Sequence, residues 1–146
     1  MHTNQTEGSV NPVGTFIGPK VLLVNGYSAS DGDLFPYRFK YNNLGTVIGH
    51  RTWGGVVGYS GTVPVVDGGS IVTPSYAPFA ADGSGFIIEG SGVSPDMEIN
   101  NDPYKEYMGE DEQLNKAIEV ILEKLKTESP KEPAIPAFPD KSGNKK

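Results

Sequence analysis

The sequence predicts an α/β domain built around a βαβ unit, and three segments lead to this prediction. Residues 20–25, "KVLLVN", form a continuous apolar run bounded by turn residues, which indicates a strand buried on both faces. Residues 31–44 have a helical pattern, and residues 46–52, "TVIGHRT", indicate a second strand. A strand, a crossover helix and a strand in this order normally make a right-handed parallel unit. We therefore expect a twisted sheet with flanking helices.

The predicted crossover helix has an apolar face and one irregular residue. Leu34, Phe35 and Phe39 are spaced to share a face of the helix. Pro36 lacks a backbone N–H, so we expect a bend or an irregular helix start.

The second half of the chain predicts hairpins followed by a packing helix. After Thr52, short β-branched runs alternate with glycine pairs, and "VDGGS" and "ADGSG" are typical of hairpin turns. Residues 111–126 place apolar side chains at i, i+3, i+4 and i+7, with acids at the start and lysines at the end. This pattern predicts a helix that packs on the sheet.

Composition separates the ends of the chain from its centre. We predict a loop or arm over residues 1–19, a folded region over residues 20–126 and a Pro/Lys-rich tail over residues 127–146. Prolines at every third position of the tail match the period of a polyproline II helix. A solvated tail or linker is the favoured interpretation, and a docking strip for an aromatic groove is the alternative.

The overall composition excludes several function classes. The 146 residues carry a net charge of −6 without a basic stripe, which argues against nucleic-acid and anionic-membrane partners. The start of the chain lacks the pattern of a signal peptide. The absence of cysteine excludes disulfides, a thiolate nucleophile and a thiolate zinc site. With only His2 and His50, we expect no metal and no cofactor.

Ser30 stands between the first predicted strand and the crossover helix, in "NGYSASDGDLFPYRFK", and two interpretations compete. A nucleophilic serine needs a sharp turn, nearby oxyanion donors and a base, and the N–H groups of Asp31 and Gly32 suit an oxyanion. Alternatively, Ser30 is a helix N-cap that pairs with Asp33, which is the commoner case on spacing alone. A cation site at Asp31 and Asp33 has little support, because no further oxygen ligands follow at a suitable spacing.

Four segments favour the nucleophile interpretation of Ser30 over the N-cap interpretation. "SASDGDLFPYRFK", "LGTVIGHRTWGGVVG", "FIIEGSGVSPDMEINNDP" and "GEDEQLNKAIEVILEKL" occur in this order. Together they resemble the catalytic core of tricorn protease and of the related C-terminal-processing (tail-specific) serine peptidases, over about residues 20–126. The resemblance implies a ClpP/crotonase-like spiral fold and a fragment of a larger peptidase. It also implies a peptide or unfolded polypeptide substrate, a possible homo-oligomer and a cytoplasmic location, with a periplasmic or exported location as the alternative.

The resemblance assigns roles to particular residues. The nucleophile of the family falls on Ser30, with the Asp31 N–H as an oxyanion donor and Gly32 leaving the approach open. Glu89 of "EGSGVSPD" falls on the acid of a Ser-His-Ser-Glu relay. Asp96 is expected to be a turn residue that caps the local backbone.

Residues 51–55, "RTWGG", are expected to support the active-site strand from beneath. In this interpretation the single tryptophan, Trp53, packs against the protein rather than binding a ligand. The two glycines are expected to let backbone segments approach closely.

The general base is not accounted for. In the family it comes from a region far upstream of the nucleophile, whereas 29 residues precede Ser30 here. His2 falls in the predicted arm, and we expect His50 to be a half-exposed strand residue without a catalytic role. The hypothesis is therefore the C-terminal part of a serine endopeptidase that forms an acyl-enzyme on Ser30 and is inactive alone. The alternative is a non-catalytic ligand- or peptide-binding module of the same fold, as in the interphotoreceptor retinoid-binding protein.

Overall fold

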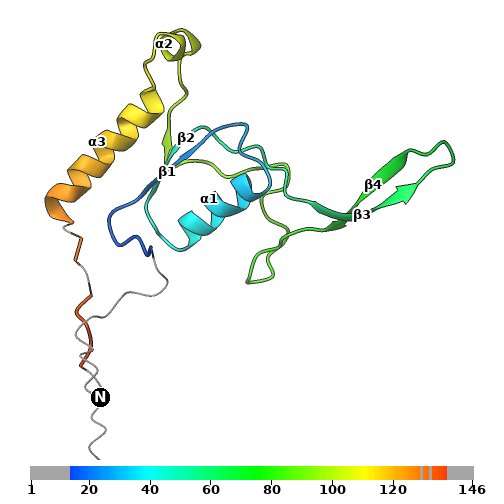
Figure 1. Ribbon diagram of the computed structural model, residues 1–146, viewed down its shortest axis with the longest axis horizontal. Coiled ribbons are helices and arrows are strands. Elements are labelled where there is room, and N and C mark those ends of the chain that lie inside the picture. The colour runs from blue at the N-terminus through cyan, green and yellow to red at the C-terminus, as the bar shows by residue number, and fades with distance from the viewer. Residues whose placement is uncertain (1–13, 129, 132, 138–146) are drawn as a thin grey trace, which may run out of the picture.

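The computed structural model describes residues 14–128, 130–131 and 133–137. This part of the chain contains five strands and three helices, whose arrangement Figure 1 shows. In chain order they are β1 (Val21–Val24), α1 (Asp31–Tyr41), β2 (Thr46–Gly49), β3 (Gly58–Pro64), β4 (Ser70–Tyr76), β5 (Met97–Glu98), α2 (Pro103–Tyr107) and α3 (Glu112–Thr127). Residues 1–13 of the predicted arm and Pro139 of the tail lie outside the described residues.

The central element is a small parallel sheet in the order β1-β2-β5. β1 and β2 pair in parallel from Val21 opposite Thr46 to Val24 opposite Gly49. α1 connects these two strands and contacts both. The predicted βαβ unit and the α/β fold class are therefore confirmed.

The best-buried strand is β2 rather than β1. Val47 and Ile48 are adjacent and completely buried, and successive strand side chains point to opposite faces, so both faces of β2 are covered. Val47 packs with Val24 and with Phe39 of α1. The expectation that β1 is buried on both faces is wrong, because Leu23 remains 38% exposed; among the described strands, β1 pairs with β2 and lies at the edge of the sheet.

α1 accommodates Pro36 without a break. The helix runs uninterrupted from Asp31 to Tyr41 with Pro36 buried inside it, and its N-cap residue, Ser30, has an unusual backbone conformation, as an irregular start would require. Its apolar side chains divide between two clusters: Phe39 joins the sheet cluster, while Leu34 packs with Val56, Ile88 and Val93. The three apolar residues of α1 therefore do not act as one face, and Phe35 stays 55% exposed.

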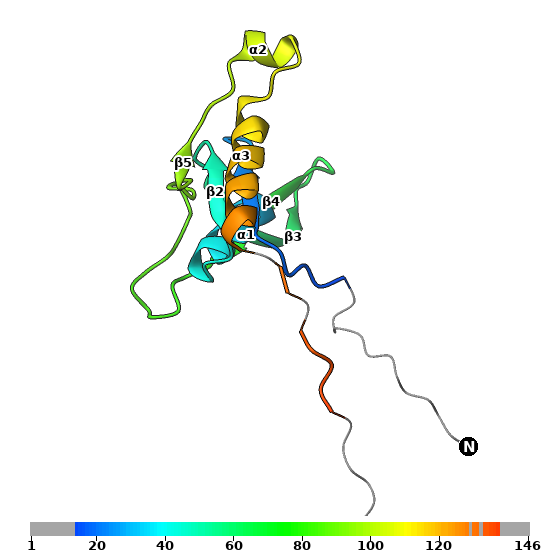
Figure 2. The same ribbon diagram turned by 90° about the vertical axis from the view of Figure 1, so that its left-hand side faces the viewer.

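α3 lies along the sheet and contacts β1 and β2, as Figure 2 shows. An apolar groove of about 640 Å³ opens between α3, α1 and the free edge of β1. No helix among the described residues combines the length and apolar character needed to cross a bilayer.

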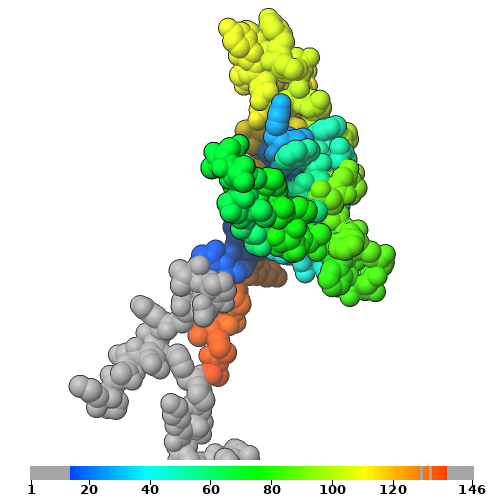
Figure 3. Space-filling view, turned by 90° about the vertical axis from the view of Figure 1, so that its right-hand side faces the viewer, coloured from blue at the N-terminus to red at the C-terminus, as the bar shows by residue number. Residues whose placement is uncertain are grey.

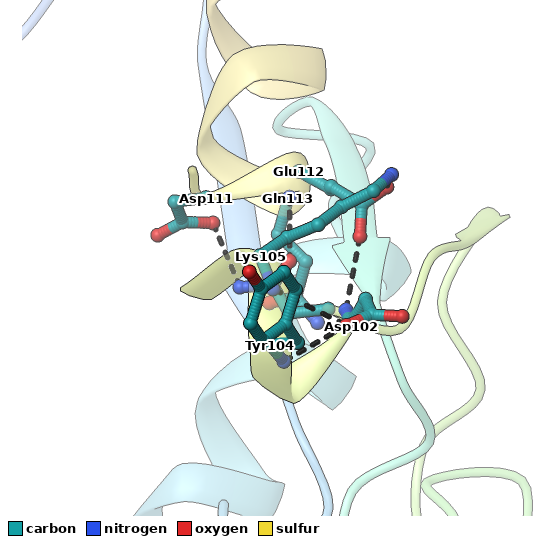
Figure 4. A network of polar contacts seen from close by, with 7 residues as sticks. Asp102, Tyr104, Lys105, Asp111, Glu112 and Gln113 are labelled. Atoms are coloured by element: carbon teal, nitrogen blue, oxygen red, sulfur yellow. Dashed lines mark hydrogen bonds and ion pairs between the residues drawn. The ribbon is translucent and has the colours of Figure 1, made fainter. Parts of the chain in front are cut away.

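α2 was not predicted, and a polar network joins it to α3 (Figure 4). Asp102 caps α2 by accepting the N–H groups of Tyr104 and Lys105. Glu112 accepts the Asp102 N–H at 2.9 Å and pairs with the Lys105 Nζ at 2.6 Å. Asp111 caps α3 by accepting the Leu114 N–H at 2.9 Å. Side chains thus satisfy the exposed backbone donors at both helix starts.

β3 and β4 form an antiparallel hairpin that projects from the rest of the molecule (Figure 1). The two strands contact each other extensively, and neither makes more than slight contact with another helix or strand of the described chain. Figure 3 views the molecule from the side toward which the hairpin points, with the hairpin in front of the body. The turns fall at the predicted "VDGGS" and "ADGSG" segments, and a Phe79–Phe86 bridge closes the second.

Candidate active site

Ser30 lies on a strained turn directly after β1. Its backbone has φ 57° and ψ −113°, a conformation that residues with a Cβ seldom adopt, and the residue is exposed. The preceding turn is closed by the Ser28 N–H, which donates to the Asn25 carbonyl at 2.9 Å. The strand, the sharp turn and the helix start therefore present Ser30 at the carboxyl edge of the sheet, as the nucleophile interpretation requires.

Asp33 holds this turn from within the protein. Its side chain is completely buried, and Oδ2 accepts the Ser30 N–H at 3.0 Å, which supplies the capping-box pairing expected from the sequence. The same carboxylate also accepts the N–H groups of Gly54 at 2.8 Å and Gly55 at 3.1 Å. Because backbone donors occupy both oxygens, the contacts give no support to a cation site at Asp31 and Asp33.

Glu89 is bound to the same loop, two residues further along. Its Oε2 accepts the Val56 N–H at 2.7 Å and the Val57 N–H at 2.9 Å. The Ser30 N–H also donates to the Gly55 carbonyl at 3.1 Å. The loop 54–57 therefore contacts Ser30 on one side and Glu89 on the other, so the fold brings together two residues that lie 59 positions apart.

A second strained turn presents Glu89. Ile88 has φ 73°, and the Glu89 N–H donates to the Ile87 carbonyl at 2.8 Å, which makes a γ-turn of the rare positive-φ kind. The Ile88 side chain is buried against Val56 and Val93, and this packing fixes the turn. The strain at Ile88, like that at Ser30, coincides with a predicted site residue.

Close backbone approach holds the turn around Glu89 against the loop. The Gly90 N–H donates to the Gly54 carbonyl at 2.7 Å. A Cβ on Gly54 would lie 2.5 Å from the Gly92 nitrogen, so the close approach expected of this glycine is confirmed. Arg51 Nη1 donates to the Ser91 carbonyl at 2.8 Å and so supports the loop, as predicted. Trp53 is 65% exposed, so the expectation that it packs against the protein is wrong.

The two expected oxyanion donors differ in availability. No backbone carbonyl of the described residues accepts the Asp31 N–H, which is at the first position of α1. The Gly32 N–H donates to the Ala29 carbonyl at 2.8 Å. Gly32 is therefore not a free donor in this structure, and Asp31 remains the candidate.

His50 is paired away from this cluster. It follows the last residue of β2, its side chain is 48% exposed, and its Nδ1 pairs with the carboxylate of Glu98 at the end of β5. None of its described hydrogen bonds reaches Ser30 or Glu89. The half-exposed bystander expected from the sequence agrees with this geometry. His2 lies outside the described residues.

Asp96 binds the sheet, so the expectation that it caps its own turn is wrong. Its Oδ2 accepts the Val47 N–H at 2.9 Å, and its Oδ1 pairs with Lys40 Nζ at 2.8 Å. Partial burial alone would raise the pKa of Asp96, but the Lys40 hydrogen bond, the Val47 N–H and the Lys40 charge together lower it.

The sequence did not reveal that Asp33 binds the loop 54–57. The spacing of Ser30 and Asp33 signalled a capping box, but the contacts with Gly54 and Gly55 join segments 21 and 22 positions apart. The sequence contained no local signal for this pairing.

Comparison with known proteins agrees with this arrangement. The model of Peptidase family S41 matches residues 2–99. The tricorn protease of Thermoplasma volcanium is 44% identical over 135 residues, which cover 89% of this chain and 13% of that protein. A crystal structure of the tricorn protease superposes with a TM-score of 0.74 at 37% identity, over 86% of this chain and 12% of that one.

A more distant structure shares the fold. Mature CPAF, solved in complex with lactacystin, has a TM-score of 0.65 at 24% identity, over 78% of this chain and 22% of that chain. This chain thus spans about an eighth of the tricorn proteases that it matches. The match to the family model, together with the tricorn relatives, shows that the chain belongs to peptidase family S41.

Proposed function

We propose that this chain is the nucleophile-bearing C-terminal part of a tricorn-like serine endopeptidase. The observation that carries the proposal is the strained, exposed Ser30 bound to the same loop as Glu89. Strain of this kind persists where the surroundings over-determine it, and it clusters at functional sites. Membership of peptidase family S41 supplies the reaction class.

In the proposed reaction, Ser30 Oγ bonds to the carbonyl carbon of a peptide as a histidine base takes the hydroxyl proton. The Asp31 N–H stabilises the oxyanion, and the amine leaves with the proton that the base returns. Water then hydrolyses the acyl-enzyme, which releases the acid and restores the Ser30 hydroxyl. No cofactor enters this scheme.

In this proposal Glu89 anchors the base. Both backbone donors bind its Oε2, so Oε1 is left for the serine-histidine relay that the family resemblance implies. The histidine comes from a segment outside these 146 residues. His50 does not fill this role, because its side chain pairs with Glu98. The chain alone is accordingly inactive, and the upstream region of a longer peptidase is its first partner.

Hydrolysis by a reconstituted enzyme tests this function. In this chimera, the present chain replaces the matching segment of the Thermoplasma volcanium tricorn protease. We expect the chimera to cleave fluorogenic peptides, Ser30→Ala to lose at least about 1000-fold in rate, and Glu89→Gln to lose less. The isolated chain should show no turnover. Equal hydrolysis by the Ser30→Ala chimera and its parent would refute the proposal.

The apolar groove beside β1 favours a second candidate, a non-catalytic module that binds a hydrophobic ligand. Apolar side chains of β1, α1 and α3 line this groove, among them Leu22, Leu23, Phe35, Leu114, Ile118 and Leu122. A chimera that folds but cleaves no peptide, while the chain binds a fatty acid or retinoid in this groove, would favour the second candidate.

Two further expectations accompany the proposal. The similarity to tricorn proteases supports a cytoplasmic location, and no finding supports the periplasmic or exported alternative. Homo-oligomer formation stays a prediction, which sedimentation of the chain and of the chimera would test.

A further inference from the structure

We propose that Asp33 is a positioning residue for Ser30, an inference that rests on the proposed function. The Asp33 side chain is completely buried, so it does not contact a substrate directly. It acts through the backbone of the nucleophile turn and of the loop 54–57. Residue spacing predicted a helix-cap role for Asp33, and the family resemblance assigned it none.

Backbone N–H groups occupy both oxygens of the Asp33 carboxylate. Oδ1 accepts the Gly54 N–H at 2.8 Å, and Oδ2 accepts the N–H groups of Ser30 at 3.0 Å and Gly55 at 3.1 Å. A helix cap needs the contact with Ser30 alone. The other two contacts reach a segment that is remote in sequence, so the carboxylate does more than begin α1.

Asp33 also restrains the strained backbone of Ser30. A serine at φ 57° and ψ −113° is held there by its surroundings. The Ser30 N–H has two acceptors, the Asp33 carboxylate and the Gly55 carbonyl, and Asp33 in turn binds the Gly55 N–H. These three residues form a closed set of contacts, and removal of Asp33 would leave the Gly55 carbonyl as the remaining restraint on the Ser30 N–H.

The loop 54–57 links Asp33 to Glu89. The loop 54–57 presents four consecutive N–H groups to two carboxylates: Asp33 accepts the first two, and Glu89 accepts the last two. Because Asp33 and Glu89 both bind the loop 54–57, this loop sets the distance between the turn that carries Ser30 and Glu89. A displacement of about 1 Å at a reacting group can reduce a rate about 100-fold.

The test compares Asp33→Ala and Asp33→Asn with Thr52→Val as the matched control. Thr52 is also completely buried, and its Oγ1 accepts a single backbone N–H, that of Val93, at 2.7 Å. Its replacement thus removes a buried acceptor close to the site without removing a contact to Ser30. Each variant is made in the isolated chain and in the tricorn chimera.

The activity readout is the rate constant for labelling of Ser30 by a fluorophosphonate in the chimera, at a temperature where every variant is folded. We expect Asp33→Ala to be labelled about 100-fold more slowly and Asp33→Asn about tenfold more slowly. Thr52→Val should stay within about twofold of the parent although its melting temperature falls. A residue that merely stabilises the fold would lower the melting temperature without slowing the labelling.

The second readout is amide hydrogen exchange in the isolated chain, which needs no activity. Asp33→Ala should expose the amides of Ser30, Gly54 and Gly55. In Asp33→Asn the side chain keeps one carbonyl oxygen, which can accept the N–H groups of Ser30 and Gly55. The Gly54 N–H would then face the side-chain NH₂ group, which is also a donor, so we expect the Gly54 amide to lose the most protection from exchange. Thr52→Val should leave these three amides protected.

Two outcomes would overturn the inference. One is labelling of folded Asp33→Ala within about twofold of the parent, and the other is an equal slowing in Thr52→Val. If the unmodified chimera is not labelled at all, the proposed function fails. In that case amide hydrogen exchange in the isolated chain is the remaining test of whether Asp33 positions the Ser30 turn. Unchanged protection of the three amides in Asp33→Ala would refute the positioning role, and their joint loss would support it.

Discussion

The loop 54–57 and the β3–β4 hairpin follow each other directly in the chain but are stabilised in different ways. The loop is held by two carboxylates, by close backbone approach and by the packing of Ile88 and Val56. The hairpin depends on its own ladder of hydrogen bonds, and Val63, Ile71 and Val72 are at least half exposed. A two-stranded hairpin alone is marginally stable in water. The loop that contacts the predicted nucleophile is therefore held by many contacts with the rest of the described chain, whereas the hairpin that follows it has few.

Two glycines with nearly the same φ angle, one in the loop and one in the hairpin, should differ most in how much an alanine substitution lowers the free energy of unfolding. Gly54 has φ +86° and Gly68, in the hairpin turn, has φ +84°. Alanine at either position costs about 1–2 kcal/mol for the left-handed backbone. At Gly54 the new Cβ would also meet the Gly92 nitrogen at 2.5 Å, whereas at Gly68 no atom lies within 4 Å.

We therefore expect Gly54→Ala to lose roughly 1–3 kcal/mol more than Gly68→Ala in the free energy of unfolding, because the clash is with backbone. Urea unfolding of both variants measures the difference. Equal losses would mean that the loop is as free to relax as the hairpin turn.

Hydrogen exchange compares the two regions within one sample. We expect the amides of β2 to exchange at least about 100-fold more slowly than those of β3 and β4, because the hairpin can open without disturbing the core. Exchange rates from NMR, divided by the rates of the unfolded chain, give this ratio. Equal protection would show that the hairpin and the sheet unfold as one unit.

A matched pair of aspartates sharpens the comparison. Asp111 accepts the Leu114 N–H at the start of α3, and Asp67 accepts the Gly69 N–H at 3.0 Å in the hairpin turn. We expect Asp111→Ala to lower the free energy of unfolding by about 1 kcal/mol, the usual cost of a lost N-cap. Asp67→Ala should change it by less than about 0.5 kcal/mol. Thermal unfolding followed by circular dichroism distinguishes this outcome from two equal losses.

The smallest expected effect concerns acid stability. Partial burial would raise the pKa of Asp96, but Lys40 and the Val47 N–H lower it from an ordinary value of 3.8. The stabilisation is therefore complete above pH 3.8 and is lost as the pH falls through the lower folded-state pKa. Because the pair is partly exposed, we expect about 0.5 kcal/mol.

Asp96→Asn should flatten the dependence of stability on pH below pH 3.8. Urea midpoints of the parent and the variant across this range provide the measurement. Parallel curves for the two proteins would show that Asp96 carries none of the acid sensitivity.

Local patterns were enough to predict most of the fold. The βαβ unit, the α3 helix and both turns follow from apolar period, glycine pairs and helix-end charges, and the structure has all of them. The burial of β1 was misjudged because an apolar run does not reveal whether a strand is central or at the edge of a sheet. α2 was missed because its five residues bury none of their side chains and depend on the caps supplied by Asp102 and α3.

The candidate site was less accessible to sequence reasoning. Ser30 and Glu89 emerged from motif order, and their common contact with the loop 54–57 is a three-dimensional fact. The availability of the Gly32 N–H depends on whether it bonds to Ala29, and the exposure of Trp53 depends on how the loop is oriented. Neither property has a signature in residue spacing.

The central claim is that Ser30 is a nucleophile whose base lies outside these 146 residues. The most direct measurement is fluorophosphonate labelling of the isolated chain and of the tricorn chimera, with the modified residue located by peptide mass. We expect a label on Ser30 in the chimera and none in the isolated chain. Labelling of Ser30 in the isolated chain that disappears in His50→Ala would contradict the claim, because the base would then be His50.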